Sequence, residues 1–349
     1  MKTKSSLFAA LGVLALASQA FSQNATTTPV GAVTLTVAAG SGTARTVTVI
    51  SIPLIEEASL TGQMSGKISS LTSSSITNGS AAWTAGELST PSAPCLIQIT
   101  SGNAIGRIFL ISSATPNTVD TLTVDSEEAS LVDLTTLGIA VGANGDTYRI
   151  LNCDTLSSFF GTPGTTGIQG AATSAGADIV QMFVSGAWRQ YYFDTDSSDW
   201  RRIGPNTASN NVAIKPDAGI MYSRLPASSL ALTVPGIVPS VARKAILRNS
   251  GTTFLAQGWP VDITLGTSGV DSTPGWLKSS SPASADIVQF QVGGAWRQYY
   301  HNGTQWLRVG PNTASNAVVI PSGSAVMISK KGSASGATSL DQSMPYSLN

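Results

Sequence analysis

The chain is poor in residues that titrate or carry charge. It has one histidine and two cysteines, and Lys, Arg, Asp and Glu make up 11% of its 349 residues. Basic and acidic residues balance at 19 each, so there is no basic surplus to neutralise nucleic-acid phosphates. After residue 22, no apolar run reaches the roughly 18–20 residues that a membrane helix needs. The composition therefore predicts no nucleic-acid partner and no transmembrane segment in the mature chain.

Sets of residues typical of catalysis are also missing. The single histidine, His301, is expected in a turn, whereas a Ser-His-Asp triad needs a buried and oriented imidazole. Asp178 and Asp286 stand at equivalent places of a repeat, and we expect them to close turns rather than to form a glycosidase pair. No glycine-rich phosphate loop precedes a helix. The sequence predicts a protein that is not an enzyme and holds no cofactor.

One acidic segment resembles half of a calcium-binding loop. It contains Asp194, Asp196 and Asp199, but it lacks the glycine and the distal glutamate of an EF-hand. The second copy of the repeat has His-Asn-Gly-Thr-Gln in its place. We therefore predict a solvated hairpin loop and no metal site, with calcium as the alternative.

The first residues predict export. Lys2 and Lys4 precede an apolar run, and small residues follow at a cleavage site near Ser22, as in a secretory signal peptide spanning residues 1–22. The protein is then periplasmic, cell-surface or extracellular. Paired cysteines in exported proteins usually bond, so a Cys95–Cys153 disulfide is predicted, with two buried free thiols as the alternative.

The strongest pattern is an internal repeat. The segment AWRQYY occurs at residues 187–192 and 295–300, and GPNTASN follows at 204–210 and 310–316. We predict an all-β fold of two tandem, sandwich-like domains, with copy 1 at residues 28–61 plus 154–227 and copy 2 at 228–331. Four alternating apolar segments within residues 62–153 predict an inserted small β-barrel or sandwich. Residues 332–349 are expected to be a flexible tail.

The repeated hexapeptide is expected to be the central strand of a hairpin. Along it, Trp188, Gln190 and Tyr192 share one face, and Arg189 and Tyr191 share the other. Trp200 and Trp306 on the following strands are expected within reach of the Trp188 face. Three roles stay open: a sandwich core, a protein-contact surface, or a carbohydrate site. The residues of the carbohydrate site would be Trp188, Tyr191, Trp296 and Tyr299 for stacking, with Arg189 and Arg297 bonding hydroxyls.

Several segments in a fixed order resemble a known family. These are ITSGNAIGRIFLI, NTVDTLTVD, GDTYRI, the W-R-x-Y-Y hairpin and the stretch Ile214–Gly219. The chain resembles a family of exported bacterial proteins with tandem W-R-x-Y-Y hairpin domains and no known activity. The resemblance implies export and a β-rich fold, and it supplies no catalytic residues.

Taken together, the sequence predicts a secreted, non-enzymatic surface, matrix or envelope protein that acts through protein contacts. The alternative is a carbohydrate-binding protein that uses the paired Trp and Tyr residues, and a hydrolase comes third. The expected partner is a protein or a glycan of the cell envelope.

Overall fold

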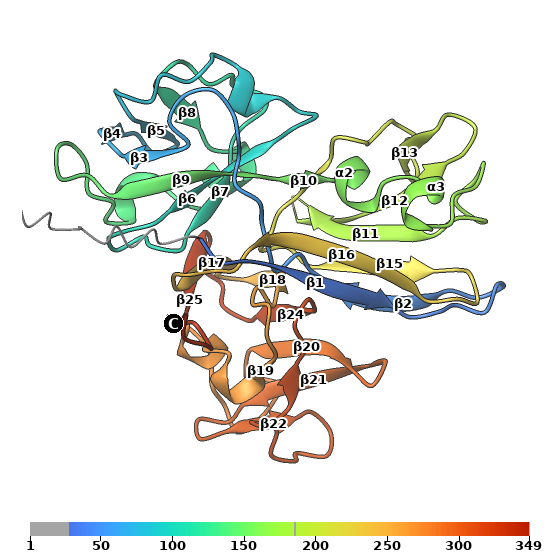
Figure 1. Cartoon of the computed structure of the whole chain (residues 1–349). Helices are drawn as coiled ribbons and strands as arrows, with labels where there is room; N and C mark the ends of the chain where they lie inside the picture. The colour runs from blue at the N-terminus through green and yellow to red at the C-terminus, as the bar shows by residue number, and fades with distance from the viewer. Residues whose placement is uncertain (1–27, 185, 349) are drawn as a thin grey trace, which may run out of the picture.

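A computed structural model describes residues 28–184 and 186–348 and confirms the all-β prediction. The predicted signal peptide lies outside these residues. The strands form three units, each with its own hydrophobic core (Figure 1). We call them the first lobe, the inserted unit and the second lobe.

The first lobe is built on a five-stranded antiparallel sheet in the order β13-β12-β11-β15-β2. Two ribbons complete it, β1 with β16 and β10 with β14. The bounds are β1 Val30–Val37, β2 Thr46–Ile50, β10 Asp154–Thr155, α2 Leu156–Phe160, α3 Pro163–Thr166, β11 Ile179–Val184, β12 Ala187–Asp194, β13 Asp199–Arg202, β14 Ala213–Ile214, β15 Ile220–Arg224 and β16 Leu230–Ile237.

The second lobe has a five-stranded sheet in the order β18-β24-β20-β21-β22, with ribbons β17-β25 and β19-β23. This sheet repeats the strand arrangement of the first lobe, with β18 in the place of β2, β24 of β15, β20 of β11, β21 of β12 and β22 of β13. The AWRQYY segments lie in the corresponding strands β12 and β21. The bounds are β17 Arg243–Arg248, β18 Gly251–Ala256, β19 Ile263–Thr264, η3 Leu265–Thr267, η4 Val270–Ser272, β20 Ile287–Val292, β21 Ala295–His301, β22 Trp306–Arg308, β23 Val319–Ile320, β24 Ala325–Lys330 and β25 Ala337–Gln342.

The inserted unit consists of two small sheets, ordered β3-β9-β6-β7 and β4-β5-β8, and does not close into a barrel. The four alternating segments of the sequence contain β6, β7, β8 and β9. The bounds are β3 Ser65–Lys67, β4 Ser70–Leu71, β5 Ser75–Thr77, η1 Glu87–Ser89, β6 Cys95–Ile99, β7 Ile108–Leu110, β8 Thr121–Thr123, α1 Ser126–Ala129, η2 Leu134–Thr136 and β9 Thr147–Asn152.

Strand pairing corrects two of the expected boundaries. The similar segments TLTV at 34–37 and ALTV at 231–234 are antiparallel partners in the β1–β16 ribbon, with Leu35 opposite Leu232, so β16 does not begin the second lobe. The expected flexible tail contains β25, which pairs along its whole length with β17 and buries Leu340 in the second core. Local sequence similarity marked these strands, but only pairing shows which lobe each one completes.

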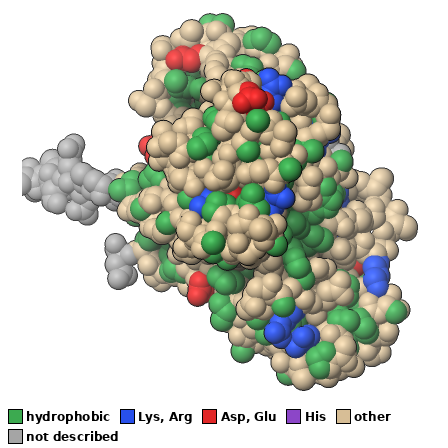
Figure 2. Space-filling view, turned by 90° about the vertical axis from the view of Figure 1, so that its right-hand side faces the viewer, with side chains coloured by type: hydrophobic (Ala, Val, Ile, Leu, Met, Phe, Trp, Pro, Cys, Tyr) green, Lys and Arg blue, Asp and Glu red, His purple; other side chains and the backbone are tan. Residues whose placement is uncertain are grey.

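The two lobes meet through the outward faces of their five-stranded sheets. Phe183 and Trp188 from the first lobe pack with Phe254, Trp296 and Met327 from the second. On the face shown in Figure 2, Lys, Arg, Asp and Glu side chains form a few small separate patches among hydrophobic side chains and tan surface.

Candidate functional site

The repeated tyrosines are core residues. Tyr191 and Tyr299 are 2% and 1% exposed and pack in the cores of the first and second lobes. Burial raises the pKa of Tyr191, and the nearby Arg189 and Arg202 oppose that rise. Of the three roles left open for the repeat, these tyrosines have the core role, and burial of their rings contradicts the alternative in which they stack on a sugar.

The tryptophans of the repeat follow a different pattern from the one expected. Trp200 lies opposite Phe193 in the β12–β13 ladder, and Trp306 lies opposite His301. Cross-strand partners share a face, so Trp200 and Trp306 lie on the Tyr191 and Tyr299 side and fill the cores. The expected placement on the Trp188 face is wrong.

Trp188 and Trp296 are half-buried at the contact between the lobes. The Trp188 ring lies edge-on to Phe183, with centroids 5.2 Å apart, and 5.3 Å from the ring of Phe254. Neighbours on both sides leave little of its face for a ligand. The repeated tryptophans therefore join the lobes rather than form separate stacking platforms.

The two arginines of the repeat lie on the tyrosine side of their strands. Arg189 and Arg297 are half-buried, and their Nε atoms have no hydrogen-bond partner among the described residues. Beside Trp188 and Trp296, exposed glutamines pair across the hairpins, Gln190 with Gln181 and Gln298 with Gln289. The arginines therefore lie across the sheet from the tryptophans with which they were expected to form a site.

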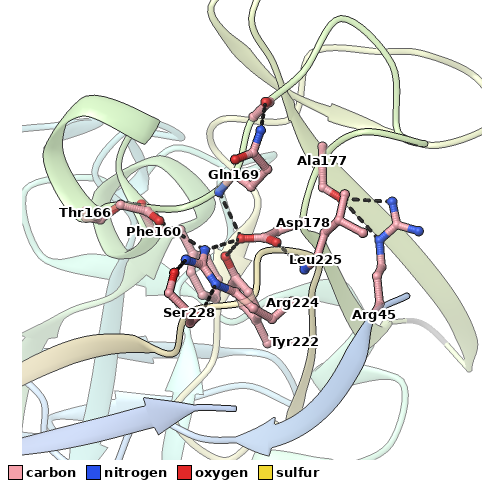
Figure 3. A network of polar contacts seen from close by, with 12 residues as sticks. Arg45, Phe160, Thr166, Gln169, Ala177, Asp178, Tyr222, Arg224, Leu225 and Ser228 are labelled. Carbon is pink, nitrogen blue, oxygen red and sulfur yellow. Dashed lines mark hydrogen bonds and ion pairs between the residues drawn. The ribbon is translucent and has the colours of Figure 1, made fainter. Parts of the chain in front are cut away.

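Asp178 and Asp286 do not close tight turns, because their carboxylates bond to backbone amides distant in the sequence, and Asp178 also forms a buried ion pair. Its carboxylate accepts hydrogen bonds from the amides of Gln169 and Leu225, from the Tyr222 hydroxyl at 2.8 Å and from Arg224 Nη1 at 2.7 Å (Figure 3). Burial and the Asp178 charge raise the pKa of Tyr222. Asp286 accepts from the amides of Leu277 and Lys331. Each carboxylate is used inside its own lobe.

The aspartates of the calcium-like segment do not converge on one point. Asp194 accepts hydrogen bonds from the Asp196 amide and the Ser197 hydroxyl, and Arg201 Nε lies 3.2 Å from its carboxylate. Asp199 accepts from the Asn210 amide instead. Within residues 28–184 and 186–348, no group of three or more His, Cys, Asp or Glu side chains is placed to hold a metal ion.

His301 is buried, contrary to the expectation of a turn. It ends β21, is 6% exposed, and its ring lies edge-on to Trp306 with centroids 5.4 Å apart. Nδ1 accepts a hydrogen bond from the Gly303 amide, and Nε2 lies 3.6 Å from Asp271 Oδ2. Burial lowers the His301 pKa, and the Asp271 charge opposes this. His301 therefore packs against Trp306 in the second lobe as Phe193 packs against Trp200 in the first.

The predicted disulfide is absent, and both cysteines are free and buried. Cys95 lies opposite Asn152 in the β6–β9 ladder, so the next residue, Cys153, points to the other face of the sheet. Accordingly, Cys95 packs in the core of the inserted unit and Cys153 in a separate cluster with Leu96 and Leu151. The bond would require a local change of sheet geometry.

We expect both thiols to be unreactive in the native protein. Burial raises the pKa of Cys95 to about 11 and also raises that of Cys153, so little thiolate forms near neutral pH. Ellman's reagent should titrate no thiol at pH 8 without denaturant and two thiols in guanidinium. A mass lower by two hydrogens in the intact protein would instead restore the disulfide prediction.

The strand edge most open to a binding partner is the outer edge of β1, which lies outside the repeat. Ile237 donates its amide to Ile55, away from β1, and Val30 is opposite Ile237 in the ribbon. In an antiparallel pair the outward and inward backbone groups alternate. Val30, Ala32, Thr34 and Thr36 therefore direct their N–H and C=O groups away from β16, and these groups have no hydrogen-bond partner among the described residues.

A groove follows this edge. It is lined by Thr34 and Thr36 of β1, by β2 and by residues 321–325 of the second lobe. The facing edge of β2 is already covered, because Gln291 bonds to both the Val47 carbonyl and the Val49 amide, and the Ser51 amide donates to Gly323. The outer edge of β1 has no such cover among the described residues (Figure 1).

One sequence signal could have indicated this edge. Pro235 has no amide proton, and proline in a strand is confined to positions whose N–H would face outward. In β16 it lies opposite Ala32, which places Ala32 at an outward position as well. The pairing of β1 with β16 was the missing information.

Comparison of the chain with protein-family models, curated proteins and solved structures finds no significant match. No described helix is long and apolar enough to cross a membrane.

Proposed function

We propose that the protein is an exported, non-enzymatic β-rich protein of the cell surface, matrix or envelope that acts through protein contacts. The observation that carries this proposal is the outer edge of β1, which no other described residue covers. Unpaired strand edges are templates for pairing with another polypeptide, and folded proteins usually cover them. Among the described residues, β2 is covered and the outer edge of β1 is not.

The proposed contact is addition of an extended partner segment to the β1–β16 ribbon. The segment would bond to the outward groups of Ala32, Thr34 and Thr36, and its side chains would enter the groove beside β2. Main-chain hydrogen bonds supply affinity in this mode of recognition, and alternate side chains supply specificity. The low surface charge fits a contact built on backbone groups and hydroxyls.

Proline substitution tests the proposal with a matched control. Thr34→Pro removes an outward N–H of β1, and Thr233→Pro removes the outward N–H of its ladder partner on the opposite edge. Both threonines are exposed, and both changes leave the β1–β16 hydrogen bonds in place. Thr34→Pro should weaken partner binding at least tenfold, about 1.4 kcal/mol, whereas Thr233→Pro should have little effect.

Photocrosslinking in the producing cells identifies the partner class. A photoreactive residue at position 34 should give covalent protein adducts, one at position 233 should not, and adding Ala32→Pro should abolish the adducts. Equal adducts from both positions would contradict an edge-specific contact. Absence of protein adducts, together with retardation of the purified protein in polysaccharide gels, would favour the carbohydrate alternative.

A further inference from the structure

In the second lobe, two arginines are neighbours on the tyrosine side of the repeated hairpin. Arg308 of β22 lies directly opposite Tyr299 in the ladder, and Arg297 precedes Tyr299 by two residues on the same face of β21. Diagonal neighbours of this kind reach each other when their side chains are long. Burial raises the pKa of Tyr299, and the charges of both arginines oppose that rise. Two guanidinium groups therefore lie near one hydroxyl group.

These two guanidinium groups have no counter-ion among the described residues. Arg297 and Arg308 are half-buried, and neither side chain has an ion pair or a hydrogen bond to another described residue. Of their nitrogen atoms, only Arg297 Nε is both buried and without a partner, so solvent reaches the terminal nitrogens of both groups. Like charges near one another repel, and an anion between them would replace this repulsion by attraction.

The first lobe repeats the arrangement. Arg202 lies opposite Tyr191, Arg189 precedes Tyr191 by two residues, and the charges of both arginines oppose the rise in the pKa of this tyrosine. Neither arginine forms an ion pair with a described residue. The residue before the second arginine differs between the lobes, Arg201 in one and Leu307 in the other, whereas the arginine beside the tyrosine is present in both. The arginine pair is therefore a property of the repeated unit.

The repeated turn GPNTASN holds the second arginine of each pair. The Arg308 amide donates to the Thr313 carbonyl, and the Arg308 carbonyl accepts from the Asn312 amide. Arg202 makes the same two bonds within its own copy of the turn. Asn312 has a φ of 53°, a left-handed conformation that asparagine adopts more readily than most residues. AWRQYY thus supplies one arginine of each pair, and GPNTASN fixes the backbone of the other.

We propose that each lobe binds one doubly charged tetrahedral oxyanion, a phosphate group, between its two arginines. The sites are Arg297 with Arg308 and Arg189 with Arg202. A planar guanidinium donates two parallel hydrogen bonds to such oxygens. Phosphate carries about two negative charges near neutral pH and matches two cations, whereas a carboxylate matches only one. The proposal concerns the repeat and does not depend on the β1 edge.

Equilibrium dialysis of the purified protein against radiolabelled phosphate, at pH 8 and constant ionic strength, tests the sites. We expect saturable binding of two phosphates per chain, and acetate should compete at least tenfold more weakly than unlabelled phosphate. Arg308→Gln and Arg202→Gln should each remove one of the two phosphates, and the double variant should bind none. Lys67→Gln removes an exposed positive charge from the inserted unit and should still bind two.

Competition by glucose 6-phosphate distinguishes two sources of the phosphate group. Competition within tenfold of that by inorganic phosphate would indicate that the sites accept phosphate monoesters carried on a larger molecule. Weaker competition would indicate free phosphate as the ligand. Glucose, the uncharged counterpart, should not compete.

Circular dichroism and thermal unfolding of each variant check folding. Because the two sites belong to different lobes, either single variant tests the proposal if the other does not fold. Three results would each overturn it. They are no saturable binding of phosphate, equal competition by acetate and phosphate, or two phosphates still bound by the folded arginine variants.

Discussion

Asp178→Ala is expected to lower the free energy of unfolding by about 3–5 kcal/mol. The Asp178 carboxylate is 1% exposed and forms a 2.7 Å ion pair with Arg224, whose side chain is 5% exposed. Removing the carboxylate leaves the guanidinium buried without its counter-ion and the Leu225 amide without its acceptor. Losing one partner of a buried pair costs far more than the pair contributes, because the other charge stays desolvated.

Denaturant unfolding followed by tryptophan fluorescence measures this change. Asp341→Ala provides the matched control, since Asp341 also pairs with a cation at 2.7 Å but is 57% exposed; its loss should cost at most about 1 kcal/mol. The double variant Asp178→Ala, Arg224→Met should recover part of the loss, because no charge then remains buried. Equal costs for the two aspartates would contradict the buried-pair argument.

Much of the β-rich fold followed from the sequence because its signals are local. Alternating apolar residues placed β6 to β9, and the repeated AWRQYY segments placed β12 and β21 at corresponding points of two sheets. The two-residue turn before Ala295 needed glycine, and Gly293 and Gly294 both have positive φ, 60° and 77°. Such features depend on a few neighbouring residues, which a sequence displays directly.

The errors concern contacts between distant segments. Alternation correctly separated Trp188 from Tyr191, but it does not tell which face a second sheet will cover. Both faces are in fact covered at these positions, by the lobe's own core on one side and by the second lobe on the other. The cysteine error has the same origin, because the β6–β9 register, not the presence of two cysteines, decides whether the thiols meet.

The candidate site was still harder to foresee. The β1 edge is defined by what does not pair with it, and the groove beside it is lined by segments from residue 34 to residue 325. No short motif brings these residues together. The sequence therefore indicated a protein acting through contacts without indicating the surface involved.

A second buried charge predicts how stability depends on pH. Glu128 of α1 is 3% exposed, accepts a hydrogen bond from the Leu110 amide, and lies 3.3 Å from Lys215 Nζ of the first lobe. Burial raises its pKa from 4.5 to about 7, and the Lys215 charge opposes this rise. Glu128 therefore ties the inserted unit to the first lobe with a carboxyl group that titrates near neutral pH.

The sign of the effect follows from proton binding. Between pH 4.5 and 7 the folded chain keeps a proton on Glu128 that the unfolded chain has released, so stability falls as pH rises through this window. A shift of this size corresponds to roughly 3 kcal/mol in total, levelling off above pH 7. The lowered pKa of His301 acts in the opposite direction, so the contribution of Glu128 must be obtained by difference.

Glu128→Gln removes this titration and keeps an oxygen to accept the Leu110 amide. Stability measured in urea from pH 4.5 to 8 should therefore fall less steeply with pH in Glu128→Gln than in the wild type. Glu127→Gln, a change at the neighbouring residue, which pairs with Arg248, should keep the wild-type slope. Parallel profiles for wild type and Glu128→Gln would mean that Lys215 holds Glu128 ionised throughout. The junction would then be a permanent ion pair, and its strength would not change over this pH range.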